Sequence, residues 1–281
     1  MTYLEFVPIA FGLLSAVTWG AGDFCGGWVS KRTGVFGVII GSQFVGMLLL
    51  IGLALIFDRT PPLPGDLLWG AAAGAGGAVG LLALYRSLAA GRMGLVAPLS
   101  AVLAAALPVL VAAFTQGLPE NVQFVGFGFA LLGVWLLSRP EGSLRFQWND
   151  LTLPVVAGLG FGLFFVFIDR ASERAAFWPI VAARVASLTL MTGTALVNRH
   201  PLWPRREHWP LTALAGVLDA GGNAFFTLAT QTGRLDVASV LSSLYPASTV
   251  ALAWAVLKER LTRPQWLGVG AALLAIVLIA L

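Results

Sequence analysis

Several polar residues recur on one face of an apolar stretch in the second half of the chain. Asp219, Asn223, Thr227 and Thr230 follow one another at spacings of four, four and three residues, so a helix would place them on one face. Their neighbours are mostly Gly, Ala and Phe. Polar groups in such surroundings usually face a protein interior or a watery cavity, because hydrocarbon cannot satisfy them. This face is the first candidate for a ligand site.

Arg184 lies inside another apolar stretch, about seven residues from its start. One interpretation is a structural ion pair with Asp219, which would let both charges enter an apolar environment. Another is that Arg184 binds the carboxylate of a substrate, for which its planar guanidinium is well suited. Both hold if substrate competes for the pair. Asp219 could instead carry a coupling proton, because burial favours the neutral form of a carboxyl group unless an opposite charge offsets it.

Asp23 is a rival candidate for coupling. It follows Trp19 by four residues and shares its helical face, although its place near the end of an apolar stretch also suits a solvated or capping role. Trp19, Tyr85 and Tyr245 lie within apolar stretches, where an indole or phenol can stack on a substrate and hydrogen-bond to it. Cavity lining and core packing are the competing interpretations for these aromatic side chains.

Two prolines, Pro108 and Pro246, lie inside apolar stretches of the two halves. Each removes a backbone donor and can bend a helix, and paired bends would suit gates. Their positions do not match between the halves.

The chain lacks the residue groupings of enzymes and metal proteins. With Cys25 alone no internal disulfide can form, and the two histidines, His200 and His208, fall in one loop. No HExxH, GxSxG or Walker pattern is present, so we expect neither catalysis nor a cofactor nor ATP hydrolysis. A channel would require repeated polar rings along a pore. One polar face fits a discrete binding site better.

The composition places these residues in a membrane. Hydrophobic residues make up 58% of the chain, charged residues 11%, and the mean hydropathy is +0.86. Ten apolar stretches of about 20 residues, each long enough to cross a bilayer as a helix, are predicted. Their approximate bounds are Leu4 to Val29, Gly34 to Phe57, Leu67 to Ala90, Leu95 to Thr115, Val122 to Ser138, Leu151 to Ile168, Phe177 to Val197, Leu211 to Thr232, Val237 to Leu257 and Gln265 to Leu281.

The second half of the sequence repeats the first. Residues of the first half recur 142 positions later, namely Gly91, Arg92, Gln123, Gly126 and Gly128 as Gly233, Arg234, Gln265, Gly268 and Gly270. We therefore predict two five-helix repeats, over residues 1–140 and 151–281. A block of five spans enters and leaves on opposite faces, so its copy must be inverted, as in many secondary transporters.

Basic residues of the predicted loops set the orientation. Twelve lie on the side reached after odd-numbered spans and four on the other, Arg59, Arg170, Arg174 and Arg234. Basic loops stay in the cytoplasm, so both termini are predicted to be non-cytoplasmic, in a bacterial inner membrane. The net charge of +4 then reflects topology, without nucleic acid as a partner.

Short motifs in order resemble the EamA family of the drug/metabolite transporter superfamily. They run from Gly91 to Pro98, Gly233 to Ser239, Thr18 to Asp23, Leu257 to Thr262 and Gln265 to Gly268. The resemblance covers nearly the whole chain. It implies ten helices in two inverted halves around a central cavity, and export of small metabolites, often amino acids, by alternating access.

These observations together yield one hypothesis about substrate binding. Arg184 and Asn223 hold the polar head of an amino acid, including aromatic or hydrophobic ones, while Trp19, Tyr85 and Tyr245 contact its side chain. A lipid or lipid-linked sugar flippase, with a lateral groove, and an exporter of another metabolite class are the alternatives. Ten spans can enclose a cavity within one chain, so a functional monomer is expected.

Overall fold

The computed structural model describes residues 3–89, 93–137, 152–257 and 262–280, and within these ranges it is helical without strands. The predicted all-helical class is therefore confirmed for this part of the chain. The helices are α1 (Tyr3–Ser30), α2 (Val35–Phe57), α3 (Pro64–Ala89), α4 (Met93–Thr115), α5 (Asn121–Leu137), α6 (Thr152–Ala171), α7 (Trp178–Val197), α8 (Trp209–Thr232), α9 (Leu235–Ser242), α10 (Tyr245–Leu257) and α11 (Arg263–Ala280), with a 3₁₀ turn, η2 (Arg206–His208), before α8.

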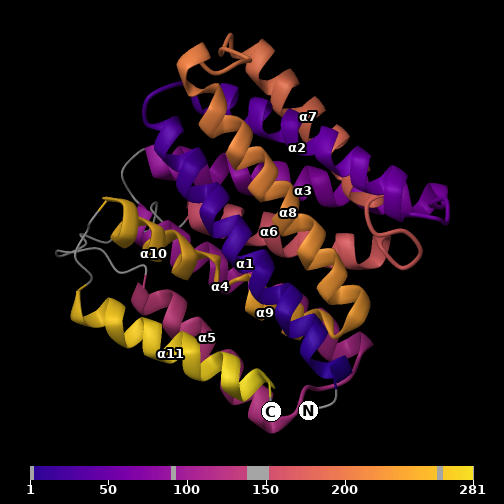
Figure 1. The fold of residues 1–281 in the computed structure, drawn as a ribbon, viewed down its shortest axis with the longest axis vertical. Helices are drawn as coiled ribbons and strands as arrows, with labels where there is room; N and C mark the ends of the chain where they lie inside the picture. The colour runs from indigo at the N-terminus through magenta and orange to yellow at the C-terminus, as the bar shows by residue number, and fades with distance from the viewer. Residues whose placement is uncertain (1–2, 90–92, 138–151, 258–261, 281) are drawn as a thin grey trace.

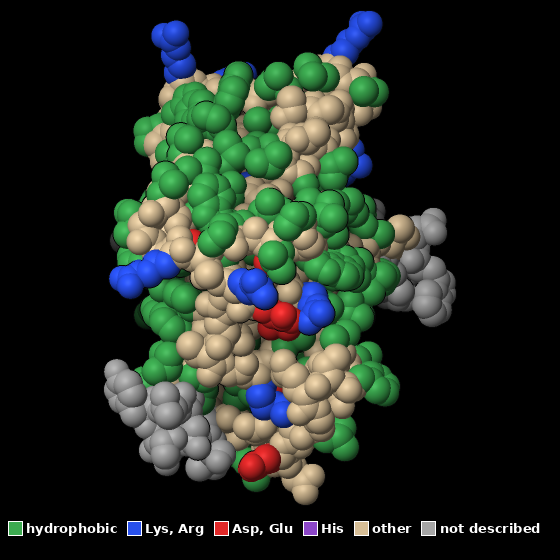
Figure 2. Space-filling view, turned by 90° about the vertical axis from the view of Figure 1, so that its right-hand side faces the viewer, with side chains coloured by type: hydrophobic (Ala, Val, Ile, Leu, Met, Phe, Trp, Pro, Cys, Tyr) green, Lys and Arg blue, Asp and Glu red, His purple; other side chains and the backbone are tan. Residues whose placement is uncertain are grey.

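Seven helical segments of the described chain are long and apolar enough to cross a membrane, and three shorter apolar helices accompany them. Large hydrophobic side chains remain exposed on the outside of the bundle, among them Leu55, Ile56, Phe114 and Val197. Figure 2 shows hydrophobic side chains over much of the visible face, with charged side chains confined to a few places. Such a surface is suited to lipid and would be unfavourable in water.

The predicted ninth span is divided in two. Ser243 and Leu244 separate α9 from α10, and the Leu244 N–H bonds to the carbonyl of Leu241, one residue short of the α-helical pattern. Pro246 explains the interruption, because it has no N–H to return to the carbonyl of Ser242. Pro108, in contrast, lies buried inside the uninterrupted α4.

Helices of the two halves pack against one another throughout (Figure 1). The first helix of each half packs on the third helix of the other, α1 on α8 and α6 on α3. In Figure 1, α2 and α7 lie at one end of the bundle and α5 and α11 at the other, with the remaining helices between them. The core is therefore built mainly from contacts between the halves.

Two close contacts between α5 and α11 occupy equivalent positions of the two halves. A Cβ placed on Gly126 of α5 would lie 2.8 Å from Cγ1 of Ile279, and one on Gly268 of α11 would lie 2.8 Å from the backbone nitrogen of Leu137. The two glycines are 142 positions apart, and so are their two partners. Small residues permit this close approach of helices. The recurrence predicted from sequence is thus also a recurrence of contacts.

Some sequence motifs fall outside the described residues. These are Gly91 and Arg92, most of the motif from Leu257 to Thr262, and the boundary between the halves from residue 138 to 151.

Candidate functional site

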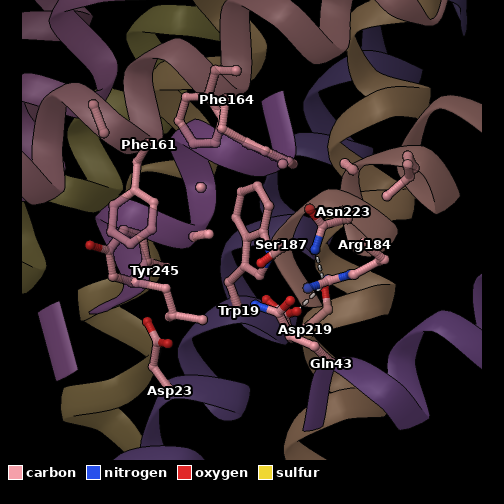
Figure 3. A pocket seen from close by; sticks show the side chains of 18 residues that line it. Trp19, Asp23, Gln43, Phe161, Phe164, Arg184, Ser187, Asp219, Asn223 and Tyr245 are labelled. Atoms are coloured by element: carbon pink, nitrogen blue, oxygen red, sulfur yellow. Dashed lines mark hydrogen bonds and ion pairs between the residues drawn. The ribbon is translucent and has the colours of Figure 1, made fainter. Parts of the chain in front are cut away.

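A cavity of about 90 Å³ lies among helices of both halves, and residues far apart in sequence line it. Its polar lining consists of Asp23, Gln43, Arg184, Ser187, Asp219, Asn223 and Tyr245, and its remaining lining of Trp19, Gly74, Gly77, Ala78, Leu81, Ala104, Phe161, Phe164, Phe165, Ile180 and Ala183. The volume is enough for several water molecules or a small organic group. Figure 3 shows the labelled side chains converging on it.

Arg184 of α7 and Asp219 of α8 form an ion pair in this cavity. The pair is asymmetric, because the Arg184 side chain is 8% exposed and the Asp219 side chain 33%. Nδ2 of Asn223 donates to the backbone carbonyl of Asp219 at 2.6 Å, one helical turn below. Nε of Arg184 has no hydrogen-bond partner among the described residues. The guanidinium therefore keeps a free donor beside its carboxylate partner.

Two further polar residues of the cavity were not anticipated from sequence. Gln43 of α2 is 3% exposed and Ser187 of α7 is 4% exposed. Neither Oε1 of Gln43 nor Oγ of Ser187 has a partner within the described part of the chain. Buried polar groups are normally paired, so two unpaired polar groups on residues of the cavity lining are unusual.

The position of Gln43 could have been predicted from the internal repeat, through its counterpart in the other half. Gly74 of α3 meets the carbonyl of Ala183 in α7, and Gly216 of α8 meets that of Ser42 in α2. Gly74 and Gly216 are 142 positions apart, whereas Ser42 and Ala183 are 141 apart. With that shift of one residue, Gln43 is the counterpart of Arg184. Both counterparts line the cavity.

Other counterparts in the cavity differ in polarity. Gly77 corresponds to Asp219 and Leu81 to Asn223, so α3 supplies apolar lining where α8 supplies polar lining. Similarly, Asp23 in α1 corresponds to Phe165 in α6. The cavity is therefore formed by equivalent helices that carry unequal side chains.

Aromatic side chains make up much of the apolar lining. Trp19 stacks on Phe165 with ring centroids 5.5 Å apart and lies 5.8 Å from Phe226, while Phe165 and Phe226 are 4.5 Å apart. Part of the indole is thus held by core packing while Trp19 also lines the cavity. Both interpretations of Trp19 given by the sequence apply to this position.

Tyr245, at the start of α10, is 8% exposed and lines the cavity, with Ser100 of α4 as its polar neighbour. Asp23 and Tyr245 lie on one side of Trp19 in Figure 3, and Arg184, Asp219 and Asn223 on the other. Asp23 forms no hydrogen bond or ion pair in the described ranges. It is a carboxylate of the cavity without a partner.

The remaining residues singled out by sequence lie elsewhere. Tyr85 of α3 does not line the cavity, and a Cβ on Gly26 of α1 would lie 2.5 Å from its hydroxyl oxygen, so the phenol packs between helices. Thr227 and Thr230 continue the polar face of α8 but are buried outside the cavity lining. Pro108 and Pro246 do not line it, although Tyr245 directly precedes Pro246.

A polar contact joins the two halves at the start of α9. Arg234 donates to Asp236 from Nε at 3.1 Å and from Nη2 at 2.8 Å, and to the backbone carbonyls of Gln116 and Gly117 at 3.2 and 2.7 Å. The N–H of Leu235 donates to Oε1 of Gln116 at 3.1 Å. The hydrogen bonds that Arg234 donates to Asp236, a completely buried carboxylate, raise the pKa of Arg234. The loop before α5 is thereby tied to α9.

A second contact between the halves involves Asp58, which follows α2. Its carboxylate oxygens accept hydrogen bonds from the backbone N–H groups of Ala176, Phe177 and Trp178, each at 2.9 Å. These N–H groups open α7 and have no partner within that helix. Asp58 therefore caps a helix of the other half.

Comparisons with known proteins agree with this description. An uncharacterised protein of Methanocaldococcus jannaschii is 27% identical over 131 residues, which are 47% of this chain and 94% of the relative. That relative is therefore about the size of one repeat. A solved crystal structure matches 96% of this chain and 95% of its own with a TM-score of 0.74 at 18% identity, which supports the fold alone.

The family comparison covers both halves. The model of the EamA-like transporter family matches residues 7–139 and again residues 150–281. The two matched segments agree with the recurrence of contacts between the halves and leave few residues unmatched. With its apolar helices and central cavity, this multi-pass membrane protein belongs to the EamA-like transporter family.

Proposed function

We propose that this protein is a secondary transporter that exports small polar metabolites by alternating access, with amino acids, including aromatic and hydrophobic ones, as the leading class. The observation that carries the proposal is the cavity between the halves, whose lining combines polar residues, among them Gln43, Arg184 and Ser187, with aromatic ones. A ligand with a polar head and an apolar body suits both parts.

In this proposal the polar head lies near Arg184 and Asn223. Nε of Arg184 is a free donor for a carboxylate, and the Ser187 hydroxyl is a second. Trp19 and Tyr245 contact the apolar body. Tyr85 was assigned to the same role from sequence, but it packs against Gly26 of α1 and does not line the cavity. In this proposal Tyr85 influences substrate binding only by positioning α1.

The topology is part of the proposal. We take α9 and α10 as one interrupted span, which is one of the seven long apolar segments. These seven and the three shorter apolar helices make ten spans, in inverted repeats over residues 1–140 and 151–281. An even number of spans agrees with Figure 1, in which the start of α1 and the end of α11 lie on one side of the bundle. Loop charge favours non-cytoplasmic termini in a bacterial inner membrane, and a cavity lined by residues of one chain favours a functional monomer.

Gating and coupling are assigned to separate features. The interruption before Pro246 lies next to Tyr245, so movement of α9 against α10 would open or close the cavity there, with Pro108 of α4 as a second flexible point. Coupling to protons was assigned to Asp219 or Asp23. Asp219 is paired with Arg184, which leaves Asp23 as the unpaired acidic group of the described lining.

Uptake of labelled amino acids into proteoliposomes tests the proposal, with empty liposomes as the control and with an imposed pH gradient as a second condition. Saturable, protein-dependent uptake is the expected result. A pH response would place an acidic residue in the cycle. Absence of uptake across the panel would contradict the amino acid assignment and direct attention to other metabolites or to a lipid flippase.

A further inference from the structure

The charges that line the cavity do not balance. Arg184 and Asp219 neutralise each other in their ion pair. Asp23 is then left without a basic partner, and the charged residue whose field reaches it is Asp219, another carboxylate. Arg184 is the only basic residue of the described lining. With its carboxylates ionised, the empty cavity carries an excess of one negative charge.

Among the residues that the structure describes, no neighbouring helix supplies the missing positive charge. The ionisable groups that share an electrostatic interaction with Asp23 are Tyr85 of α3, Tyr245 of α10 and Asp219 of α8. Cys25 is the next ionisable group on α1 itself. All of these are neutral or negative. A carboxylate in such a place is stabilised only by a bound proton or by a cation that enters the cavity.

The other groups of the cavity indicate what kind of cation fits. Trp19, Phe161 and Phe164 provide aromatic surface, on which an organic cation can lie with a favourable cation–π contact. Oε1 of Gln43, an independent feature, is an unpaired acceptor on a side chain only 3% exposed. An amide oxygen of this kind can accept a hydrogen bond from an ammonium group, and it can equally coordinate an inorganic cation. The aromatic surface of the lining is therefore the feature that favours an organic cation.

We propose that Asp23 binds the ammonium group of a protonated organic amine, so that the cavity prefers cationic amines and cationic amino acids over zwitterions, and zwitterions over anions. The proposal rests on the proposed function in taking this cavity as the substrate site. It adds a charge preference and assigns that preference to one residue. Because the counterpart of Asp23 in the other half is Phe165, the site exists once in the chain.

The test compares three probes with the same apolar body: phenethylamine, phenylalanine and 3-phenylpropionate. Binding to the full-length purified protein is measured by isothermal titration calorimetry for the wild type, Asp23→Asn, Asp23→Glu and Glu173→Gln. Glu173 is the control, since its carboxylate is 59% exposed and pairs with Arg170 outside the cavity. Thermal unfolding of each variant checks that it is folded.

The expected order for the wild type is phenethylamine tightest and 3-phenylpropionate weakest. Asp23→Asn weakens phenethylamine by about tenfold or more and narrows the spread among the probes, as loss of a charged partner would require. Asp23→Glu retains the order, and Glu173→Gln matches the wild type. If a folded Asp23→Asn variant binds all three probes as the wild type does, Asp23 is not the ammonium site.

Two further arms separate this proposal from its competitors. If sodium binds the wild type but not Asp23→Asn, while the three probes are unaffected by the substitution, Asp23 holds an inorganic cation and the proposal is overturned. The proposal is also overturned if Asp23→Asn changes the pH dependence of transport and leaves probe binding unaltered, since Asp23 would then bind only a proton. If the wild type shows saturable transport and Asp23→Asn binds the three probes with the same order and affinities as the wild type, the charge preference is overturned and the proposed function stands. If the wild type neither binds the probes nor transports amino acids, the charge preference and the proposed function are both contradicted.

Discussion

Asp219 is the exposed partner of a buried cation: its side chain is 33% accessible, while that of Arg184, with which it pairs, is 8% accessible. The carboxylate can therefore be reached from the cavity without displacing the guanidinium from its packing. A substrate carboxylate that replaces Asp219 leaves Arg184 neutralised throughout, which avoids the cost of a bare buried charge. The pair is suited to competition with substrate.

Removal of Arg184 is expected to abolish saturable transport. Because breaking a buried pair by losing one partner costs about 3–5 kcal/mol, Arg184→Ala alone tests folding as well as function. The matched variant is the double change Arg184→Gln with Asp219→Asn, which removes both charges and retains side chains of similar size. We expect it to fold and to transport nothing in the uptake assay. Normal transport by either folded variant would show the carboxylate assignment to be wrong.

The substitution Gln43→Leu should affect the stability of the protein and its affinity for substrate in different ways. The unpaired Oε1 of Gln43 is a buried acceptor, and loss of such a group can relieve about 1–3 kcal/mol of desolvation. We therefore expect an unchanged or higher unfolding temperature in detergent together with a raised KM for transport. A lower unfolding temperature with an unchanged KM would indicate that Gln43 has a structural role in place of one in binding.

Asp58→Ala is expected to lower the free energy of unfolding by about 1–2 kcal/mol, because three N–H groups at the start of α7 lose their acceptor. The matched control is Asp66→Ala, since Asp66 accepts from Leu63 at 2.8 Å and so acts within one half. Thermal unfolding followed by circular dichroism measures both. An equal loss in the two variants would argue against a special role for the contact between halves.

The contact made by Arg234 is expected to be independent of pH in the working range. Hydrogen bonding to Asp236 raises the pKa of Arg234 above its ordinary value, so the contribution of the contact to stability is fully present below that ordinary value and is lost only as pH rises beyond the raised pKa. Stability measured from pH 6 to 9 should therefore change equally in the wild type and in Arg234→Lys. Arg234→Lys should be less stable at every pH, because an ammonium cannot reproduce the fork that reaches Asp236 and Gly117. A pH-dependent difference between the two would contradict this assignment.

The sequence predicted the polar half of the cavity better than its complete lining. Arg184, Asp219 and Asn223 stand out because charged and amide groups are costly in an apolar stretch, and the structure brings them together. Gln43 escaped notice because it is a single polar residue with no polar neighbour at helical spacing. Tyr85 was assigned to the cavity because it lies within an apolar stretch. A single aromatic residue in a span has no periodic pattern that shows which face of the helix it occupies.

The interruption between α9 and α10 shows a similar limit. Pro246 marks a defect in the hydrogen-bond ladder, yet composition alone does not decide between a bend and a break. Here the preceding residues adopt a tighter turn, with Leu244 bonded to Leu241, and the chain resumes as a new helix at Tyr245. That outcome depends on how α9 packs against α1 and α4, which only the folded chain specifies.

The unequal counterparts in the cavity bear on the energetics of a transport cycle. If the two halves had the same sequence, the inward-open and outward-open forms would have equal free energies and equal affinity for any substrate. That equality is lost because the counterpart of Asp219 in the other half is Gly77, and the counterpart of Asp23 is Phe165. Substrate can then be held more tightly when the cavity opens to one compartment than to the other, so the two half-reactions of the cycle run at different rates even without a gradient.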